Sequence, residues 1–138
     1  MDENGKKDAL QRKYAQYQAM KQQMSVLLQE RLILEEKSSE LLMSAEAMKR
    51  VRKEDREKSV WSPIGSGVFA KASLSDGENF ILGIGAGIFV EERRESAIAI
   101  LEARRMEIMK YMEQLQTEAE KLAKEAEGLE AELQKIMQ

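Results

Sequence analysis

The chain has 138 residues, with 25 acidic and 22 basic side chains and a formal net charge of −3. It contains no cysteine and no histidine, which excludes disulfide bonds, thiolate zinc sites and catalysis by histidine. Charged residues make up 34% and aromatic residues only 5%, a composition typical of long helices, and the charge balance is too even to indicate nucleic-acid binding.

The first part of the chain predicts a long helix over residues 8–58. This stretch contains no proline and no glycine, so nothing in it breaks a helix. Apolar residues recur in alternating steps of three and four, which is the spacing of a coiled-coil seam. The predicted seam consists of Leu10, Lys13, Tyr17, Met20, Met24, Leu27, Arg31, Leu34, Ser38, Leu41, Ala45 and Met48.

Residues 60–91 predict a small β module. The single proline and six of the eight glycines fall between residues 63 and 87, which excludes a helix there. Apolar runs between these residues predict four short strands in two hairpins, with a turn at Ser75-Asp76-Gly77. The runs Phe80-Ile81-Leu82 and Ile88-Phe89-Val90 are apolar on both faces, so we expect strands of other subunits to cover them.

Residues 92–137 predict a second long helix with a more regular seam. The seam is Ile98, Leu101, Arg105, Ile108, Met112, Leu115, Ala119, Leu122, Ala126, Leu129, Leu133 and Ile136, about six heptads in length. We expect Arg31 and Arg105, which interrupt the two seams, to extend outward to solvent. Two helices of similar length around a compact insert predict an antiparallel hairpin, in which the numbers of facing residues add to about 147.

Two motifs in the β module resemble the α class of archaeal prefoldin subunits. One is Ser62-Pro63-Ile64-Gly65-Ser66-Gly67-Val68-Phe69-Ala70-Lys71-Ala72, and the other is Ile84-Gly85-Ala86-Gly87-Ile88-Phe89-Val90-Glu91. The resemblance extends to the whole helix–β–helix plan, and the presence of two hairpins is similar to the α class. One departure is Ser62, which stands before the proline where the family usually has an aliphatic residue.

That resemblance implies a fold and a function. The fold class would be mostly α with a small β module: a single prefoldin-like domain over residues 1–138, whose two β-hairpins join a multi-subunit β-barrel. The partners would be prefoldin beta subunits, with two α and four β chains in a hexamer. The complex would be a cytosolic, ATP-independent holdase that holds unfolded client proteins at its coiled-coil tips and delivers them to a group II chaperonin. No cofactor, metal or enzymatic activity is expected.

The candidate site residues form two groups, neither of them catalytic. Client binding is expected near both chain ends, where packing partners run out and methionine adapts to irregular apolar surfaces. These residues are Leu10, Tyr14, Tyr17, Met20, Met24, Leu129, Leu133, Ile136 and Met137. The expected assembly residues are Val60, Val68, Phe69, Phe80, Ile81, Leu82, Ile88 and Val90. Four apolar residues outside the seam, Leu28, Leu32, Leu42 and Met43, are expected to widen the seam or to pack on neighbouring stalks.

Other functions fit the sequence less well. The G-x-G spacings at Gly65 and at Gly83 could cradle a phosphate, but a β-like run follows each, which favours a crowded strand junction. The basic run over residues 49–58 could bind nucleic acid, but it contains acidic residues and ends a helix, which favours a solvated terminus. The carboxylates of the second helix are too dispersed to suggest a metal site. No apolar run approaches the length of a bilayer span, and no signal peptide is expected.

The main alternative is a structural or scaffolding coiled-coil subunit, or a filament former, without a client-holding role. It accounts for the heptads and the strands equally well, so only binding of unfolded chains at the tips separates the two functions.

Overall fold

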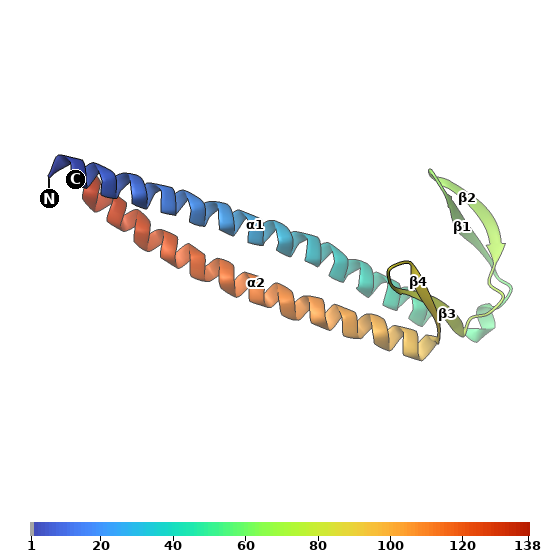
Figure 1. Ribbon diagram of the computed structural model, residues 1–138. Helices are drawn as coiled ribbons and strands as arrows, with labels where there is room; N and C mark the ends of the chain where they lie inside the picture. The colour runs from blue at the N-terminus through green and yellow to red at the C-terminus, as the bar shows by residue number, and fades with distance from the viewer. Residues whose placement is uncertain (1) are drawn as a thin grey trace. The chain divides into compact units, whose positions relative to one another are not determined.

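The computed structural model describes residues 2–138, apart from the side chain of Lys53. The elements follow in the order α1 (Glu3–Arg50), η1 (Lys53–Asp55), β1 (Ser59–Gly65), β2 (Val68–Ser73), β3 (Asn79–Gly85), β4 (Ile88–Arg93) and α2 (Arg94–Met137) (Figure 1). Two long helices and two small antiparallel hairpins confirm the predicted fold class. Neither helix contains a stretch, within the described residues, that is apolar enough to cross a bilayer.

The chain divides into two compact units. We call the first, Met1–Ser38 with Glu107–Gln138, the terminal unit, and the second, Ser39–Met106, the central unit. In the terminal unit α1 and α2 run in opposite directions, so the start of α1 and the end of α2 lie at one end (Figure 1). We call this end the tip.

The seam of the terminal unit follows the predicted heptads. Every predicted seam position in this unit is buried or half-buried, because the 3.5-residue repeat keeps these side chains on the face that meets the partner helix. Two cross-helix hydrogen bonds fix the register: Lys13 Nζ donates to Glu132 Oε2 at 2.8 Å, and Tyr111 Oη donates to Glu30 Oε1 at 2.9 Å. In each pair the two residue numbers add to a sum that lies within about six of the predicted value of about 147.

Arg31 does not extend freely to solvent as expected. It is half-buried in the seam, and its Nε is buried without an acceptor among the described residues. The end of the side chain forms a long ion pair, in which Arg31 Nη1 lies 3.8 Å from Glu35 Oε2. An arginine therefore occupies a position at which the heptad pattern requires an apolar residue.

The central unit has a small core between the helices and one hairpin. Its buried members are Ala45, Leu82, Ala97 and Leu101, and Leu41, Met48, Phe80, Val90 and Ile100 pack around them. One face of β3–β4 is therefore covered by the chain's own helices, and Arg104 Nη2 holds the hairpin by donating to Gly83 O at 3.0 Å. The expectation that both faces of these strands need another subunit is wrong for this face.

The first helix ends at Arg50 rather than at residue 58. The carboxylate of Asp55 accepts hydrogen bonds from the backbone N–H of Arg52 at 2.8 Å and from Lys58 Nζ at 2.7 Å. The bond to Arg52 gives a backbone N–H a partner outside the helix, and Glu57 follows with a positive φ of 71°. At the other junction β4 continues through Arg93, so Glu91 and Glu92 belong to the strand and Glu95 alone lies in the first turn of α2.

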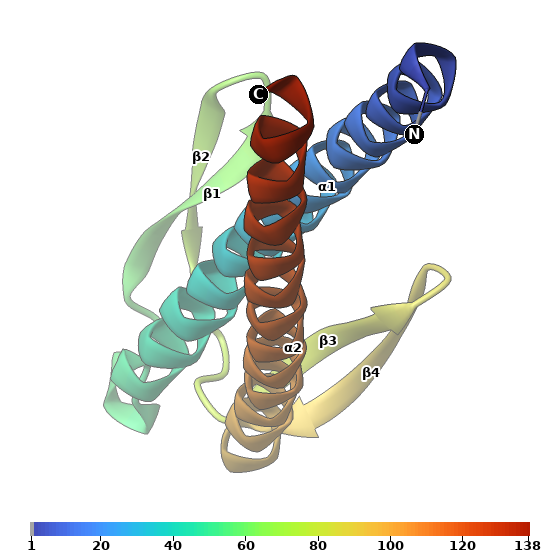
Figure 2. The same cartoon turned by 90° about the vertical axis from the view of Figure 1, so that its left-hand side faces the viewer.

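The two hairpins are separate two-stranded sheets, β1 with β2 and β3 with β4 (Figure 2). Ser75-Asp76-Gly77 links them rather than forming a hairpin turn, and Asp76 Oδ1 accepts from the backbone N–H of Glu78 at 2.7 Å. The turns lie at Ser66-Gly67 and Ala86-Gly87, where all four residues have positive φ, as type I′ turns require.

The two turns need glycine because of the backbone conformation there, and not because a larger side chain would lack space. Gly67 and Gly87 have φ of 77° and 73°, and a Cβ on either would meet no described atom within 4 Å. A Cβ on Gly83 would lie 3.4 Å from the Phe89 ring, which is an ordinary van der Waals contact. The expected crowding is therefore wrong for the turn glycines, and Gly83 has only a side chain as its close neighbour.

Candidate functional site

The residues expected to bind clients all lie at or near the tip of the terminal unit, but they differ in exposure. Leu129 and Leu133 are 8% and 7% exposed, because they fill the seam between the helices. Tyr14 is 56% exposed and Met137 is 75% exposed. The other five expected residues, Leu10, Tyr17, Met20, Met24 and Ile136, are half-buried. In the closed hairpin the tip therefore offers two large apolar side chains fully and several others in part.

One ion pair joins the two helices close to the tip, and two further polar contacts lie within α1. The Lys13–Glu132 ion pair bridges α1 and α2 at 2.8 Å. The hydrogen bond from Lys13 and the positive charge of its ammonium group lower the pKa of Glu132 below the ordinary value of 4.5. Lys21 places its ammonium group 5.1 Å from the centre of the Tyr17 ring, within the range of a cation–π contact. Asp2 Oδ1 accepts from the backbone N–H of Gly5 at 2.7 Å and so caps the start of α1.

Further apolar side chains are exposed along the terminal unit away from the tip. They are Val26, Leu28, Leu32, Ile33, Met109 and Tyr111. Leu28 and Leu32 do not widen the seam of the single chain as one expectation held, and neither do Leu42 and Met43 in the central unit, because all four are exposed. The sequence indicates this surface by two runs of three apolar residues in α1, Val26-Leu27-Leu28 and Leu32-Ile33-Leu34. Only one residue of each run can face the seam, so the others are left exposed.

The expected assembly residues separate into an exposed set and a packed set. Leu82 is buried, and Phe80 and Val90 pack beside it against the helices of the central unit. The other five, Val60, Val68, Phe69, Ile81 and Ile88, are exposed. Sequence reasoning missed Trp61, Ile64, Ile84 and Phe89, which are exposed strand residues of the same kind. Alternation places Ile81 and Leu82 on opposite faces, but it does not distinguish Ile88 from Val90, so the tertiary packing decides which residues are covered.

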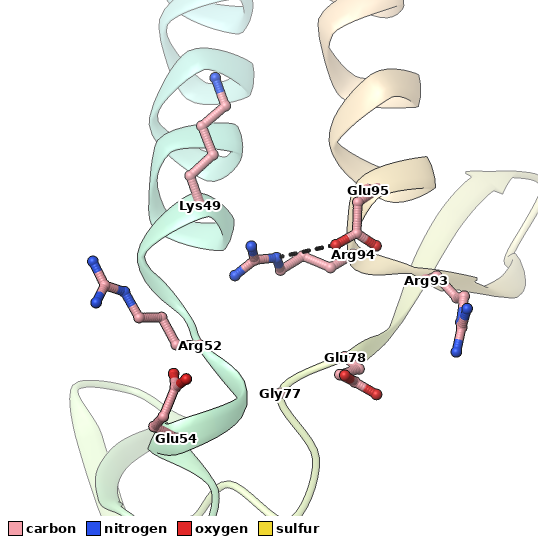
Figure 3. A pocket seen from close by; sticks show the side chains of 8 residues that line it. All are labelled: Lys49, Arg52, Glu54, Gly77, Glu78, Arg93, Arg94 and Glu95. Carbon is pink, nitrogen blue, oxygen red and sulfur yellow. Dashed lines mark ion pairs between the residues drawn. The ribbon is translucent and has the colours of Figure 1, made fainter.

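A polar pocket of about 600 Å³ lies where the helices of the central unit meet the strands (Figure 3). Its lining is Lys49, Arg52, Glu54, Gly77, Glu78, Arg93, Arg94 and Glu95. Lys49 Nζ lies 2.9 Å from Glu102 Oε1, and Arg94 Nε lies 3.8 Å from Glu95 Oε1. Arg94 also donates to the backbone carbonyl of Val51, which ties the end of α1 to the start of α2. Lys49 and Arg94 thus join the two helices, and the mostly polar lining offers little apolar surface to a ligand.

Comparison with known proteins gives matches that cover most of the chain. A family model, Prefoldin subunit, matches residues 20–138. The chain is 28% identical to prefoldin subunit alpha of Pyrococcus horikoshii over 124 residues, 89% of this chain and 84% of that protein. It is 25% identical to prefoldin subunit alpha of Methanosarcina mazei over 125 residues, 88% of either chain. The match with the Methanosarcina barkeri subunit, 29% identical, spans 63% of that relative.

A solved structure shares the fold. A chain in the cryo-EM structure of filamentous PFD from Methanocaldococcus jannaschii superposes with a TM-score of 0.75 at 22% identity, covering 84% of this chain and 96% of that chain. The family match, the alpha subunits that align along most of the sequence and this shared fold agree with one another. The chain therefore belongs to the prefoldin family, and its similarity is to archaeal alpha subunits.

Proposed function

We propose that this chain is an ATP-independent holdase subunit that binds non-native proteins at the tip of its helical hairpin. This proposal rests mainly on the exposure of Tyr14 and Met137 near the tip, where α1 begins and α2 ends. A rigid aromatic ring and an adaptable thioether side chain suit the binding of many different apolar segments. Membership of a chaperone family supports the same function.

Binding at one tip is expected to be weak. Burial of apolar surface contributes roughly 25 cal/mol per Å² before the cost of ordering the bound segment. The closed tip exposes few large apolar groups, and Leu129 and Leu133 become available only when the ends of the helices separate. Several tips acting on one client would raise the effective affinity, because each further contact is then intramolecular. The proposal therefore includes an oligomer.

The oligomer we propose contains prefoldin beta subunits, held through the exposed side chains of the two hairpins, and it delivers clients to a group II chaperonin. Alpha subunits are the relatives that this chain resembles, which supports a beta-class partner. The exposed apolar residues of all four strands support assembly through the hairpins, since such a surface is unusual on a monomer.

The test compares tip variants with equally exposed positions elsewhere. Tyr14→Ser with Met137→Ser removes the two exposed tip side chains, and Met43→Ser with Met106→Ser is the matched control in the central unit. We expect the tip variant, purified in its native complex, to lose most of its suppression of client aggregation, measured by light scattering. The control should keep full activity. Removal of about ten residues from both ends should also abolish holding and leave the complex intact, because the hairpins are untouched.

Full suppression by the tip variant would contradict the proposed site. Absence of client binding by any form of the complex would instead favour the alternative, a structural or filament-forming coiled coil.

A further inference from the structure

We propose that Met137 is a site of reversible oxidation, at which a hydroperoxide converts the thioether to the sulfoxide and thereby weakens client binding at the tip. The inference rests on the proposed holding function, because it concerns the same surface, and it adds a chemical signal that regulates this surface. It is carried by the exposure of Met137 and by the surface that Met137 shares with Tyr14.

The thioether of Met137 is open to a small oxidant in solution. Met137 is 75% exposed, more than any other large apolar residue that the structure describes. It is the last residue of α2, so no further helical turn follows it. Met20 and Met24, the methionines on the α1 side of the tip, lie in the seam and are half-buried. Because oxidation follows exposure, Met137 is expected to react before Met20 and Met24.

Met137 and Tyr14 lie on the same side of the helical hairpin. Each stands four residues after a buried or half-buried residue of the seam. Lys49 and Glu102 hold the same heptad position in the central unit, and their charged groups meet across the seam at 2.9 Å. The heptad repeat therefore places the Tyr14 ring and the Met137 thioether on one side of the seam. One apolar segment of a client can cover both side chains.

The reaction is a two-electron oxidation of the sulfur. A lone pair of Met137 Sδ attacks the terminal oxygen of the hydroperoxide, and the S–O bond forms as the O–O bond breaks. The proton of the transferred oxygen moves to the departing oxygen, which leaves as water or as an alcohol. A sulfoxide reductase reverses the change, since two thiols are oxidised to a disulfide while the sulfoxide oxygen leaves as water.

A sulfoxide at Met137 opposes burial by a client. Its oxygen is a hydrogen-bond acceptor, and an apolar client segment offers no donor to it, so covering this oxygen has a desolvation cost that the thioether does not have. The seam is not disturbed, because Met137 is exposed and lies outside it. Oxidation therefore lowers the affinity for clients without unfolding the tip.

The experiment treats the purified full-length chain with dilute hydrogen peroxide, removes the peroxide with catalase and maps the sulfoxides by peptide mass spectrometry. Binding is then titrated by fluorescence anisotropy with a labelled unfolded probe, reduced and carboxymethylated α-lactalbumin. We expect the oxidised chain to bind the probe roughly threefold or more weakly than the untreated chain. Reduction by methionine sulfoxide reductases with a thiol should restore the affinity.

Three variants assign the effect to one sulfur. Met137→Leu keeps an apolar side chain that peroxide does not oxidise, so its affinity should be the same before and after treatment. Met137→Gln introduces a polar group and should bind weakly without treatment. Met43→Leu with Met106→Leu removes two methionines of similar exposure in the central unit, and this variant should stay as sensitive as wild type. Circular dichroism checks that the helix content of each chain is unchanged.

Undiminished binding by a wild-type chain whose Met137 is fully oxidised overturns the inference. So does a Met137→Leu chain that loses affinity on treatment, because another residue then carries the effect. Both results leave the proposed holding function in place, since the untreated chain binds the probe. An untreated chain that does not bind the probe contradicts holding at this tip, and the inference falls with it.

Discussion

Individual seam residues decide how well the two helices of the terminal unit fit together. Leu115, Ala119 and Ala126 are buried where the pattern places an apolar side chain. Arg31 occupies a position of the same kind, and its Nε is buried without an acceptor among the described residues. An unsatisfied buried donor costs on the order of 1–3 kcal/mol. Arg31 is therefore expected to lower the stability of the seam.

We predict that Arg31→Leu stabilises the chain by about 1 kcal/mol or more, because it removes the unsatisfied donor and fills the seam. Thermal unfolding followed by circular dichroism should show a higher midpoint. Arg12→Leu, which makes the same change at an exposed position outside the seam, should not raise it. A lower midpoint for Arg31→Leu would mean that the guanidinium group contributes more than its burial costs.

The pairing of α1 with α2 near the tip rests in part on one exposed ion pair. Lys13 and Glu132 join residues far apart in the sequence, and an exposed pair of this kind contributes little by itself. Its contribution depends on pH in a defined direction. Because Lys13 lowers the pKa of Glu132 in the folded chain, protonation of Glu132 favours separation of the helices.

The stabilisation by this pair should be complete above the ordinary pKa of 4.5 and lost as the pH falls through the lower pKa of the folded state. We predict that Glu132→Gln lowers the thermal midpoint slightly at pH 6 and that the difference from wild type shrinks progressively as the pH is lowered below 4.5. Glu130→Gln, a neighbouring exposed residue for which the described residues show no ion pair, should match wild type throughout this range. A difference that does not shrink on acidification would show that the effect does not come from the ion pair.

At the scale of the whole molecule, the hairpins combine internal packing with an outward apolar surface. Leu82 is buried against Ala45, Ala97 and Leu101, whereas its neighbour Ile81 points away from that core and is exposed. Adjacent residues of β3 thus have different surroundings: Leu82 contributes to the core of the central unit, whereas Ile81 is exposed, and we propose that it contacts other chains.

We predict opposite effects of truncating these two neighbours in the native complex. Leu82→Ala should lower the free energy of unfolding by about 2–5 kcal/mol, because it leaves a cavity in the small core of the central unit. Ile81→Ala, combined with Phe89→Ala, should leave the fold of the chain intact and lower the native mass of the complex. Native mass spectrometry and chemical unfolding distinguish these results. An unchanged mass for Ile81→Ala with Phe89→Ala would contradict a role of these two side chains in assembly.

Periodicity predicted those parts of the fold that depend on local sequence. The seam from Leu10 to Ile136 and the four strands appear where spacing and glycine placed them. The end of α1 at Arg50 was not predictable from helix breakers, because no glycine or proline stands there and the chain turns where the backbone N–H of Arg52 bonds to the Asp55 side chain instead. Such bonds compete with the helix only in one local geometry.

The candidate site was predictable in position but not in exposure. Leu129 and Tyr14 belong to the same end of the hairpin, yet one is buried and the other exposed. Their difference follows from the heptad positions, since the seam buries its own members first. For β3, the sequence shows an apolar run without showing that the chain's own helices cover Leu82 and leave Ile81 free. That distinction requires the tertiary packing.

The division of the β module into two hairpins limits the number of strands that each copy can add to a closed sheet. Each copy of the chain adds strands only in antiparallel pairs, β1 with β2 and β3 with β4. Neighbours in a closed sheet can alternate in direction all the way round only if the number of strands is even. Any number of copies of this chain satisfies that condition. A different subunit that added an odd number of strands to such a sheet would force one parallel neighbour pair or leave an open edge.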